Sequence, residues 1–149
     1  MIIACILLAV ILRAGQDKKY FWVLAWPGTV MHELLHYTVG FFLFARPTEI
    51  SVVPERFENT TIGYVSFVNL NWFNSLPTAM APLLALPIAW WATSVIPLEW
   101  SWAGLAWLWV ISAMISQAVP SSVDFALGTQ NKFGLIFWAA VIYLLFIRG

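Results

Sequence analysis

Long apolar segments, interrupted by few charges, dominate this sequence. Of its 149 residues, 62% are hydrophobic and only 9% are charged, whereas a soluble globular domain carries roughly a quarter charged residues. Seven basic and seven acidic side chains are too few to cover the surface that a folded chain of this size leaves exposed. The composition therefore predicts an integral membrane protein in which residues 1–149 form a single membrane domain.

The same inventory excludes several other classes of protein. The formal net charge is zero and no cluster of Lys and Arg is present, which excludes the basic surface of a nucleic-acid-binding protein. The single cysteine, Cys5, excludes an internal disulfide framework and a zinc cluster built from thiolates. We therefore expect no nucleic-acid partner.

Apolar runs mark the expected helices. A spanning helix needs about 20 apolar residues, and the candidate spans lie at residues 1–12, 20–45, 76–98, 100–128 and 133–147. We predict an all-α, multi-pass (polytopic) bundle of four to five transmembrane helices, in the cytoplasmic membrane if the source is bacterial. The first segment also resembles a signal sequence, but it lacks basic residues before it and a cleavage site after it, so we expect it to be retained.

A polar stretch, residues 46–75, lies between the second and third predicted spans. Over residues 61–70 alternate positions share a face, with Ile62, Tyr64, Ser66, Val68 and Leu70 on one side, and this period of two predicts a strand. Residues 49–53 are a second candidate strand, and turn-forming residues lie between the two. We predict a short β-hairpin-like insertion here; the alternative is an amphipathic loop on the membrane surface.

An HExxH motif, His32-Glu33-Leu34-Leu35-His36, lies within the second predicted span. Histidines four residues apart share one helical face, so both imidazoles can bind one zinc ion, and Glu33 can act as general base. Ionisable groups at mid-membrane depth are costly, and a metal bound by both imidazoles offsets that cost. The alternative is a polar contact between helices in which both histidines are hydrogen-bonded.

A catalytic zinc needs a third protein ligand, and the sequence has no third histidine. Glu99 is typical of a turn at the end of a span. Asp124 lies within an apolar stretch, and if one helix continues through it, Gln117, Ser121 and Asp124 share one polar face. Such a face would place hydrogen-bonding partners beside a ligand. We therefore predict Asp124 as the third ligand; the alternative places it in a solvated loop.

An HExxH motif in a span, a β-like segment after it and an aspartate in a later span resemble the site-2 protease family, the M50 intramembrane metalloproteases. The resemblance is to compact members without accessory domains, and it covers residues 20–130. It implies that His32, His36 and Asp124 bind zinc and that Glu33 is the base.

Two elements of the family pattern differ in this chain. The family's aspartate usually follows Asn-Pro and precedes Gly, whereas serines precede Asp124 and Phe125 follows it. The family's Gly-Pro-x-x-Asn element corresponds to Ala81-Pro82-Leu83-Leu84, which lacks the asparagine. Candidates for supporting the metal or the oxyanion are therefore Gln117, Ser121, Asn69, Asn71 and Asn74.

The resemblance implies hydrolysis of a peptide bond in or near a transmembrane segment of a membrane-protein substrate. A chain of 149 residues leaves no room for a soluble sensor domain, so we expect control by a membrane partner or by prior trimming of the substrate. The second strand would hold the substrate extended by β-augmentation, and the residues on one of its faces are Ile62, Tyr64, Ser66 and Val68. Two alternatives remain. The first is a catalytically inactive zinc-binding membrane scaffold, and the second is a small transporter subunit that relays protons or metal ions.

Overall fold

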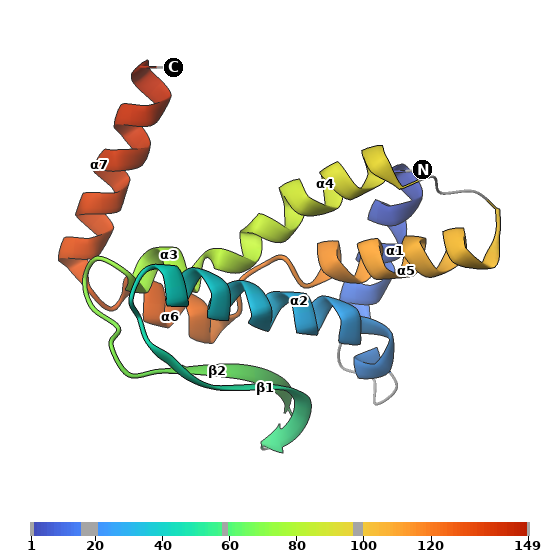
Figure 1. Cartoon of the computed structure of the whole chain (residues 1–149), viewed down its shortest axis with the longest axis horizontal. Helices are drawn as coiled ribbons and strands as arrows, with labels where there is room; N and C mark the ends of the chain where they lie inside the picture. Colours follow the sequence, from blue (N-terminus) through green and yellow to red (C-terminus); the bar gives the residue numbers. More distant parts are fainter. Residues whose placement is uncertain (1, 16–20, 58–59, 97–99, 149) are drawn as a thin grey trace.

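The computed structural model describes residues 2–15, 21–57, 60–96 and 100–148, which form helices and one two-stranded sheet (Figure 1). In chain order the elements are α1 (Ile2–Ala14), α2 (Phe21–Phe42), β1 (Pro47–Phe57), β2 (Thr60–Phe67), α3 (Ser75–Ala79), the 3-10 helix η1 (Ala81–Leu84), α4 (Ala85–Val95), α5 (Trp102–Ser116), α6 (Ser122–Thr129) and α7 (Lys132–Arg148). The chain is thus mainly helical.

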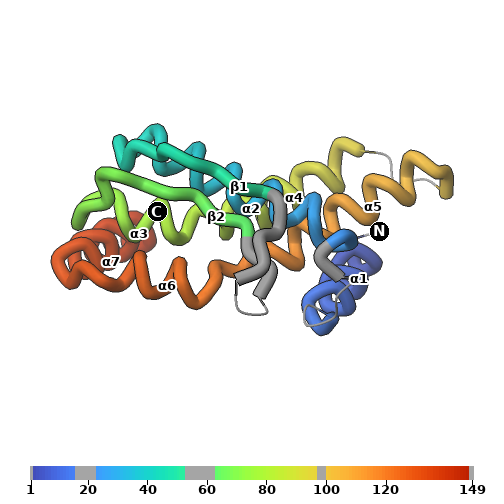
Figure 2. Tube along the Cα trace, turned by 90° about the horizontal axis from the view of Figure 1, so that it is seen from below, coloured from blue at the N-terminus to red at the C-terminus, as the bar shows by residue number. Residues whose placement is uncertain are grey.

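Helix α2 lies at the centre of the arrangement. It packs against α5, η1 and α3, and the hairpin β1–β2 lies along it, as both views show (Figures 1 and 2). Helix α7 packs only at its start, against α3 and α6, and then projects away from the other helices (Figure 1). The central helix therefore contacts the hairpin, α3, η1 and α5, while α6 packs against α3.

Small residues let α2 approach α5 closely. A Cβ built at Gly28 would overlap the carbonyl group of Ala113 on α5, so only glycine fits at this crossing. Beside it, the buried cluster around Leu35 contains only alanines, Ala81, Ala85 and Ala118. The helix backbones therefore lie near one another, and side chains one turn further along α2 reach backbone groups of the neighbouring elements.

The predicted hairpin is present, with a first strand longer than expected and a second strand that ends three residues earlier, at Phe67. Strands β1 and β2 pair in antiparallel fashion, with Ile50 opposite Val65 and Ser51 opposite Tyr64. The next described pair is Glu55 opposite Ile62, so three residues of β1 lie opposite Gly63 alone. This register shift is a bulge, and a bulge bends and twists the strand that carries it.

Two of the predicted spans are interrupted. Residues 76–98 divide into α3, η1 and α4, with Pro82 at the start of η1. Residues 100–128 divide into α5 and α6, because Gln117 caps the end of α5 and Ser121 caps the start of α6. Pro120 lies between these caps and has no N–H with which to continue a helix. The expected continuous polar face from Gln117 to Asp124 is therefore wrong.

The predicted bundle of four to five transmembrane helices is also wrong. Among the described residues, no single helix combines the length and the hydropathy needed to cross a membrane. Helix α2 has 22 residues, but its ionisable HExxH side chains lower its hydropathy. Helices α6 and α7 satisfy both criteria only when joined, and the chain bends by 93° between them. This finding overturns the all-α polytopic class and the multi-pass integral membrane localisation, because the apolar runs that predicted spans are divided into shorter helices.

Candidate metal centre

Two histidines of α2 form one side of the site. His32 and His36 are four residues apart on this helix, so their rings lie on the same face. Their Nε2 atoms are 3.1 Å apart. His36 is buried, and the side chain of His32 is 12% exposed. The two imidazoles therefore converge on one point at the side of α2.

Asp124 forms the other side, and a helix cap fixes its position. The Ser121 hydroxyl accepts the backbone N–H of Asp124 at 3.1 Å, and Asp124 Oδ2 accepts the backbone N–H of Ser121 at 2.6 Å. This reciprocal pair is a capping box at the start of α6. From that position Asp124 Oδ1 lies 3.1 Å from His36 Nε2, and Oδ2 lies 3.4 Å from His32 Nε2.

The three residues together could hold a metal ion. One ligand atom from each of His32, His36 and Asp124 lies within 4.8 Å of the others. These are the ligands predicted from the sequence, although Asp124 reaches the histidines from the first turn of a separate short helix. Two imidazole nitrogens and a carboxylate suit several divalent transition metals.

Backbone carbonyls fix the orientation of both imidazoles. His32 Nδ1–H donates to the carbonyl of Gln117 at 2.7 Å, and His36 Nδ1–H donates to the carbonyl of Thr78 at 2.8 Å. A carbonyl can only accept, so Nδ1 carries the proton and Nε2 of each neutral ring presents a lone pair. Metal-ligating histidines usually donate their other ring N–H to such a group.

Asp124 and His32 each favour the charged form of the other. Burial opposes ionisation of Asp124, but the hydrogen bonds that the imidazolium forms of His32 and His36 donate through Nε2–H outweigh it and hold the pKa of that carboxyl well below its ordinary value. Burial likewise favours neutral His32, yet the hydrogen bond to Asp124 and the carbonyl of Gln117 raise the pKa of the imidazole. A positive charge, whether a proton or a metal ion, is therefore stabilised between these residues.

Glu33 lies beside the first histidine and is buried, with 6% of its surface exposed. Its carboxylate accepts no hydrogen bond within the part of the chain that the structure describes. Burial raises the pKa of Glu33, the charges of His32 and His36 oppose that rise, and the charge of Asp124 adds to it. A carboxyl whose pKa is raised by burial, within electrostatic reach of the three ligands, is suited to accept a proton.

The predicted supporting residues act through different groups than expected. Gln117 contributes its backbone carbonyl, and Ser121 contributes the cap that holds Asp124. Thr78 was not predicted, and it too acts through its carbonyl. A backbone acceptor carries no signal in the residue type, so sequence reasoning had no means to identify Thr78.

The asparagines form a separate network near the end of α2. Asn69 donates to the carbonyl of Phe44 at 2.9 Å, and the fully buried Asn74 donates to the carbonyls of Leu43 and Asn69. The side-chain oxygen of Asn71 accepts the backbone N–H groups of Phe73 and Asn74. These amides are hydrogen-bonded to the loops that they join, and none of them contacts the three ligands through a described hydrogen bond.

The face of β2 that was predicted to bind substrate lies on the side away from α2. Gly63 and Phe67, on the opposite face, lie against Glu33 and Gly40 of α2. On the predicted face, the hydroxyl of Tyr64 donates to Glu49 at 3.1 Å, and Val68 is 71% exposed. The carbonyl of Ser66 accepts the hydroxyl of Thr48. The side chain of Ile62 lies outside the described residues.

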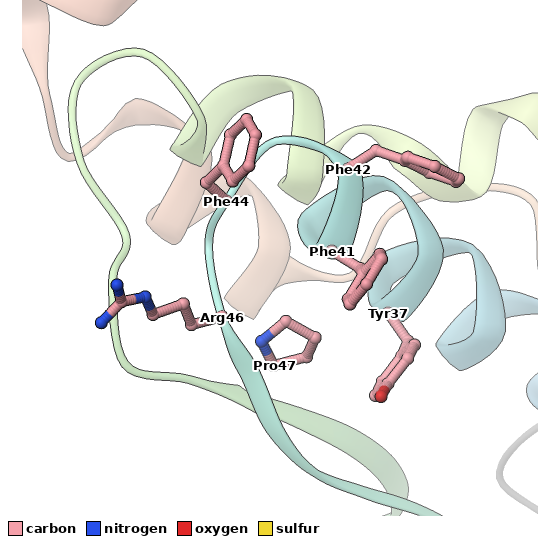
Figure 3. A pocket seen from close by; sticks show the side chains of 6 residues that line it. All are labelled: Tyr37, Phe41, Phe42, Phe44, Arg46 and Pro47. Carbon is pink, nitrogen blue, oxygen red and sulfur yellow. The ribbon is translucent and has the colours of Figure 1, made fainter.

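A separate hollow of about 410 Å³ lies at the C-terminal end of α2 (Figure 3). Its lining residues are Tyr37, Phe41, Phe42, Phe44, Arg46 and Pro47. In Figure 3 the Arg46 side chain extends away from the rings of Tyr37 and Phe41. The lining contains none of the three ligands, so this hollow is distinct from the metal centre.

Comparison of the chain with protein-family models, with curated proteins and with solved structures finds no match.

Proposed function

We propose that the protein is a zinc-dependent peptidase in which His32, His36 and Asp124 bind the metal and Glu33 is the general base. One observation carries the proposal. The Nε2 atoms of two histidines and both carboxylate oxygens of Asp124 meet at one point, while each Nδ1–H donates to a carbonyl. Two imidazoles and one carboxylate, with HExxH on a helix, are a donor set typical of catalytic zinc.

Zinc bound at this site would act as a Lewis acid and lower the pKa of a coordinated water toward about 7. Glu33 accepts the proton of the attacking water, and it later donates that proton to the leaving amine. Its burial and raised pKa favour this exchange, because a carboxyl that titrates closer to neutral pH both accepts and returns a proton readily. Asp124 would bind the metal as a carboxylate, the form in which an acidic side chain ligates zinc.

The substrate that best fits the hairpin is a peptide in extended conformation. A two-stranded sheet has free edges, and an extended peptide binds such an edge through main-chain hydrogen bonds. Gly63 of strand β2 lies against Glu33. A peptide aligned with this strand would therefore lie near the metal centre. The expectation of a substrate within a transmembrane segment depended on the predicted spans, and it is not part of this proposal.

The first experiment is to measure zinc content and hydrolysis in the same preparations. We expect about one zinc ion per chain in the wild-type protein and cleavage of fluorescein-labelled casein or of a quenched fluorescent peptide library. Glu33→Gln should retain the zinc and lose the cleavage. A wild-type protein that binds no zinc when zinc is supplied would overturn the proposal, and so would full cleavage by Glu33→Gln.

The same pair of measurements tests the main rival, a metal-binding protein without catalysis. Such a protein would bind zinc equally in the wild type and in Glu33→Gln, and neither would cleave any peptide. The raised pKa of Glu33, caused first by burial, favours the catalytic alternative, since such a carboxyl is suited to accept a proton.

A further inference from the structure

Gly63 of β2 lies directly against Glu33 of α2. A Cβ built at Gly63 would be 2.9 Å from Cγ of Glu33 and 3.0 Å from its Oε1. It would also be 3.0 Å from the carbonyl oxygen of Ser51 on β1. Two of these three contacts involve Glu33, so a side chain at position 63 would compete with the carboxylate for the same space.

The backbone conformation at position 63 does not require glycine. No glycine in the described part of the chain has a positive φ, so Gly63 adopts a conformation that other residues can also adopt. Glycine is therefore needed at this position for the space beside Glu33.

The hairpin has little freedom to move away from α2. On one side of Gly63, the Trp26 indole N–H donates to the carbonyl of Val52 at 3.1 Å, which ties β1 to the first half of α2. On the other side, the Phe67 ring lies directly over Gly40, near the end of α2. Because both contacts hold the strands along the helix, a Cβ at position 63 would displace the Glu33 side chain, and Cγ can move only by rotation about χ1.

We infer that Gly63 is a positioning residue, whose missing side chain sets where the Glu33 carboxylate lies beside the metal centre. The inference rests on the proposed function, because it gives Gly63 a role in catalysis only through Glu33. It predicts that a single added methyl group lowers the catalytic rate and leaves the metal ligands in place.

The first test needs neither metal nor substrate. Gly63→Ala should lower the urea midpoint of the metal-free protein, and the decrease should be smaller in the Glu33→Ala background, which has no Cγ to displace. Gly40→Ala is the matched control. Its Cβ would overlap the Phe67 ring, so its decrease should be the same in both backgrounds. Equal decreases for Gly63→Ala in both backgrounds would overturn the inference.

The second test uses the zinc-loaded protein. Gly63→Ala should retain the wild-type zinc content and KM for the quenched peptide, while kcat falls by about 10²-fold, the loss typical of a catalytic group misplaced by about 1 Å. In the Glu33→Asp background, whose carboxylate is withdrawn by one methylene, Gly63→Ala should cost kcat less. A wild-type kcat in Gly63→Ala would overturn the positioning role.

The two tests separate this inference from the proposed function. If the wild-type protein cleaves no peptide, the proposed function fails, and the coupling between Gly63→Ala and Glu33→Ala in the metal-free protein still decides whether Gly63 sets the position of Glu33. If cleavage is found but the coupling is absent, the proposed function stands and the inference fails.

Discussion

The Nε2 atoms of His32 and His36 lie 3.1 Å apart, and the Nδ1–H of each ring donates to a backbone carbonyl. Two nitrogen lone pairs at this separation repel each other unless a cation lies between or beside them. The carbonyls of Gln117 and Thr78 prevent the rings from turning away. The protein therefore orients both imidazoles toward one point that suits a metal ion.

Asp124→Asn should reduce zinc affinity by more than the 10–100-fold typical of a lost outer-sphere partner. The amide keeps an oxygen that can accept the Ser121 N–H, so α6 stays capped while the ligand loses its charge. Isothermal titration with zinc alone, together with the zinc content of the purified protein, measures the change. Wild-type affinity in this variant would exclude Asp124 as a ligand.

Ser121→Ala separates the cap from the ligand. This change removes the hydroxyl that accepts the Asp124 N–H, and it should cost about 0.5–2 kcal/mol of stability. The carboxylate remains, so zinc affinity should fall by at most 10–100-fold. Urea unfolding and zinc titration of the same preparation distinguish this variant from Asp124→Asn; an equal loss of zinc in both variants would contradict the separate roles.

Glu33→Gln should lower kcat by about 10²–10⁴-fold, the usual contribution of a general base, without loss of zinc. It should also stabilise the metal-free protein at neutral pH. Burial raises the pKa of Glu33, so the ionised carboxylate costs stability that the amide does not. Thermal unfolding measures this effect, and Glu49→Gln, the same change at an exposed position, should leave the midpoint unchanged. A lower midpoint for Glu33→Gln would mean that the carboxylate has a structural partner.

Stability of the metal-free protein should depend on pH through Asp124 and His32. The pKa of Asp124 is lowered in the folded state. The carboxylate therefore stabilises the fold when the pH is above its ordinary pKa, and this stabilisation is lost as the pH falls below that pKa. The pKa of His32 is raised in the folded state. The imidazole therefore stabilises the fold when the pH is below its ordinary pKa, and this stabilisation is lost as the pH rises through the pKa of the folded protein. Unfolding in urea should therefore show greatest stability between these limits, and a flat profile would contradict the ion pair.

Zinc affinity should rise with pH, because the metal must displace the proton that His32 binds more tightly than an ordinary imidazole. Release of one proton corresponds to about a tenfold change in affinity per pH unit while the imidazole is protonated. Titration with zinc at about pH 6 and about pH 7 tests this dependence. Equal affinities at the two values would show that no proton is displaced.

Asn74→Ala should lower stability without a direct effect on zinc binding. The side chain is fully buried and donates to the carbonyls of Leu43 and Asn69, and each buried acceptor left unpaired costs about 1–3 kcal/mol.

Asn71→Ala should likewise reduce stability and leave kcat near its wild-type value. A selective loss of kcat in Asn71→Ala would restore the oxyanion role considered from the sequence.

The sequence predicted the part of the site that depends on local geometry. His32 and His36 share a helical face whenever their segment is helical, and the polar alternation from residue 61 onward was enough to predict a hairpin. The approach of Asp124 depends on the break between α5 and α6, which a continuous apolar run conceals. Apolar composition likewise does not reveal where helix caps and Pro120 divide an apolar run into shorter helices. The prediction of membrane spans was therefore wrong.

The close crossing of α2 and α5 at Gly28 and Ala113 lies one helical turn before the contact of His32 with Gln117. Four residues of helix measure about 6 Å, so a rocking of α2 by about 10° around this crossing moves His32 by only about 1 Å. The same rotation moves the end of α2, about 21 Å from the crossing, by about three and a half times as much. His32 therefore lies close to the point where α2 and α5 cross, where a rotation of one helix against the other displaces a ligand least.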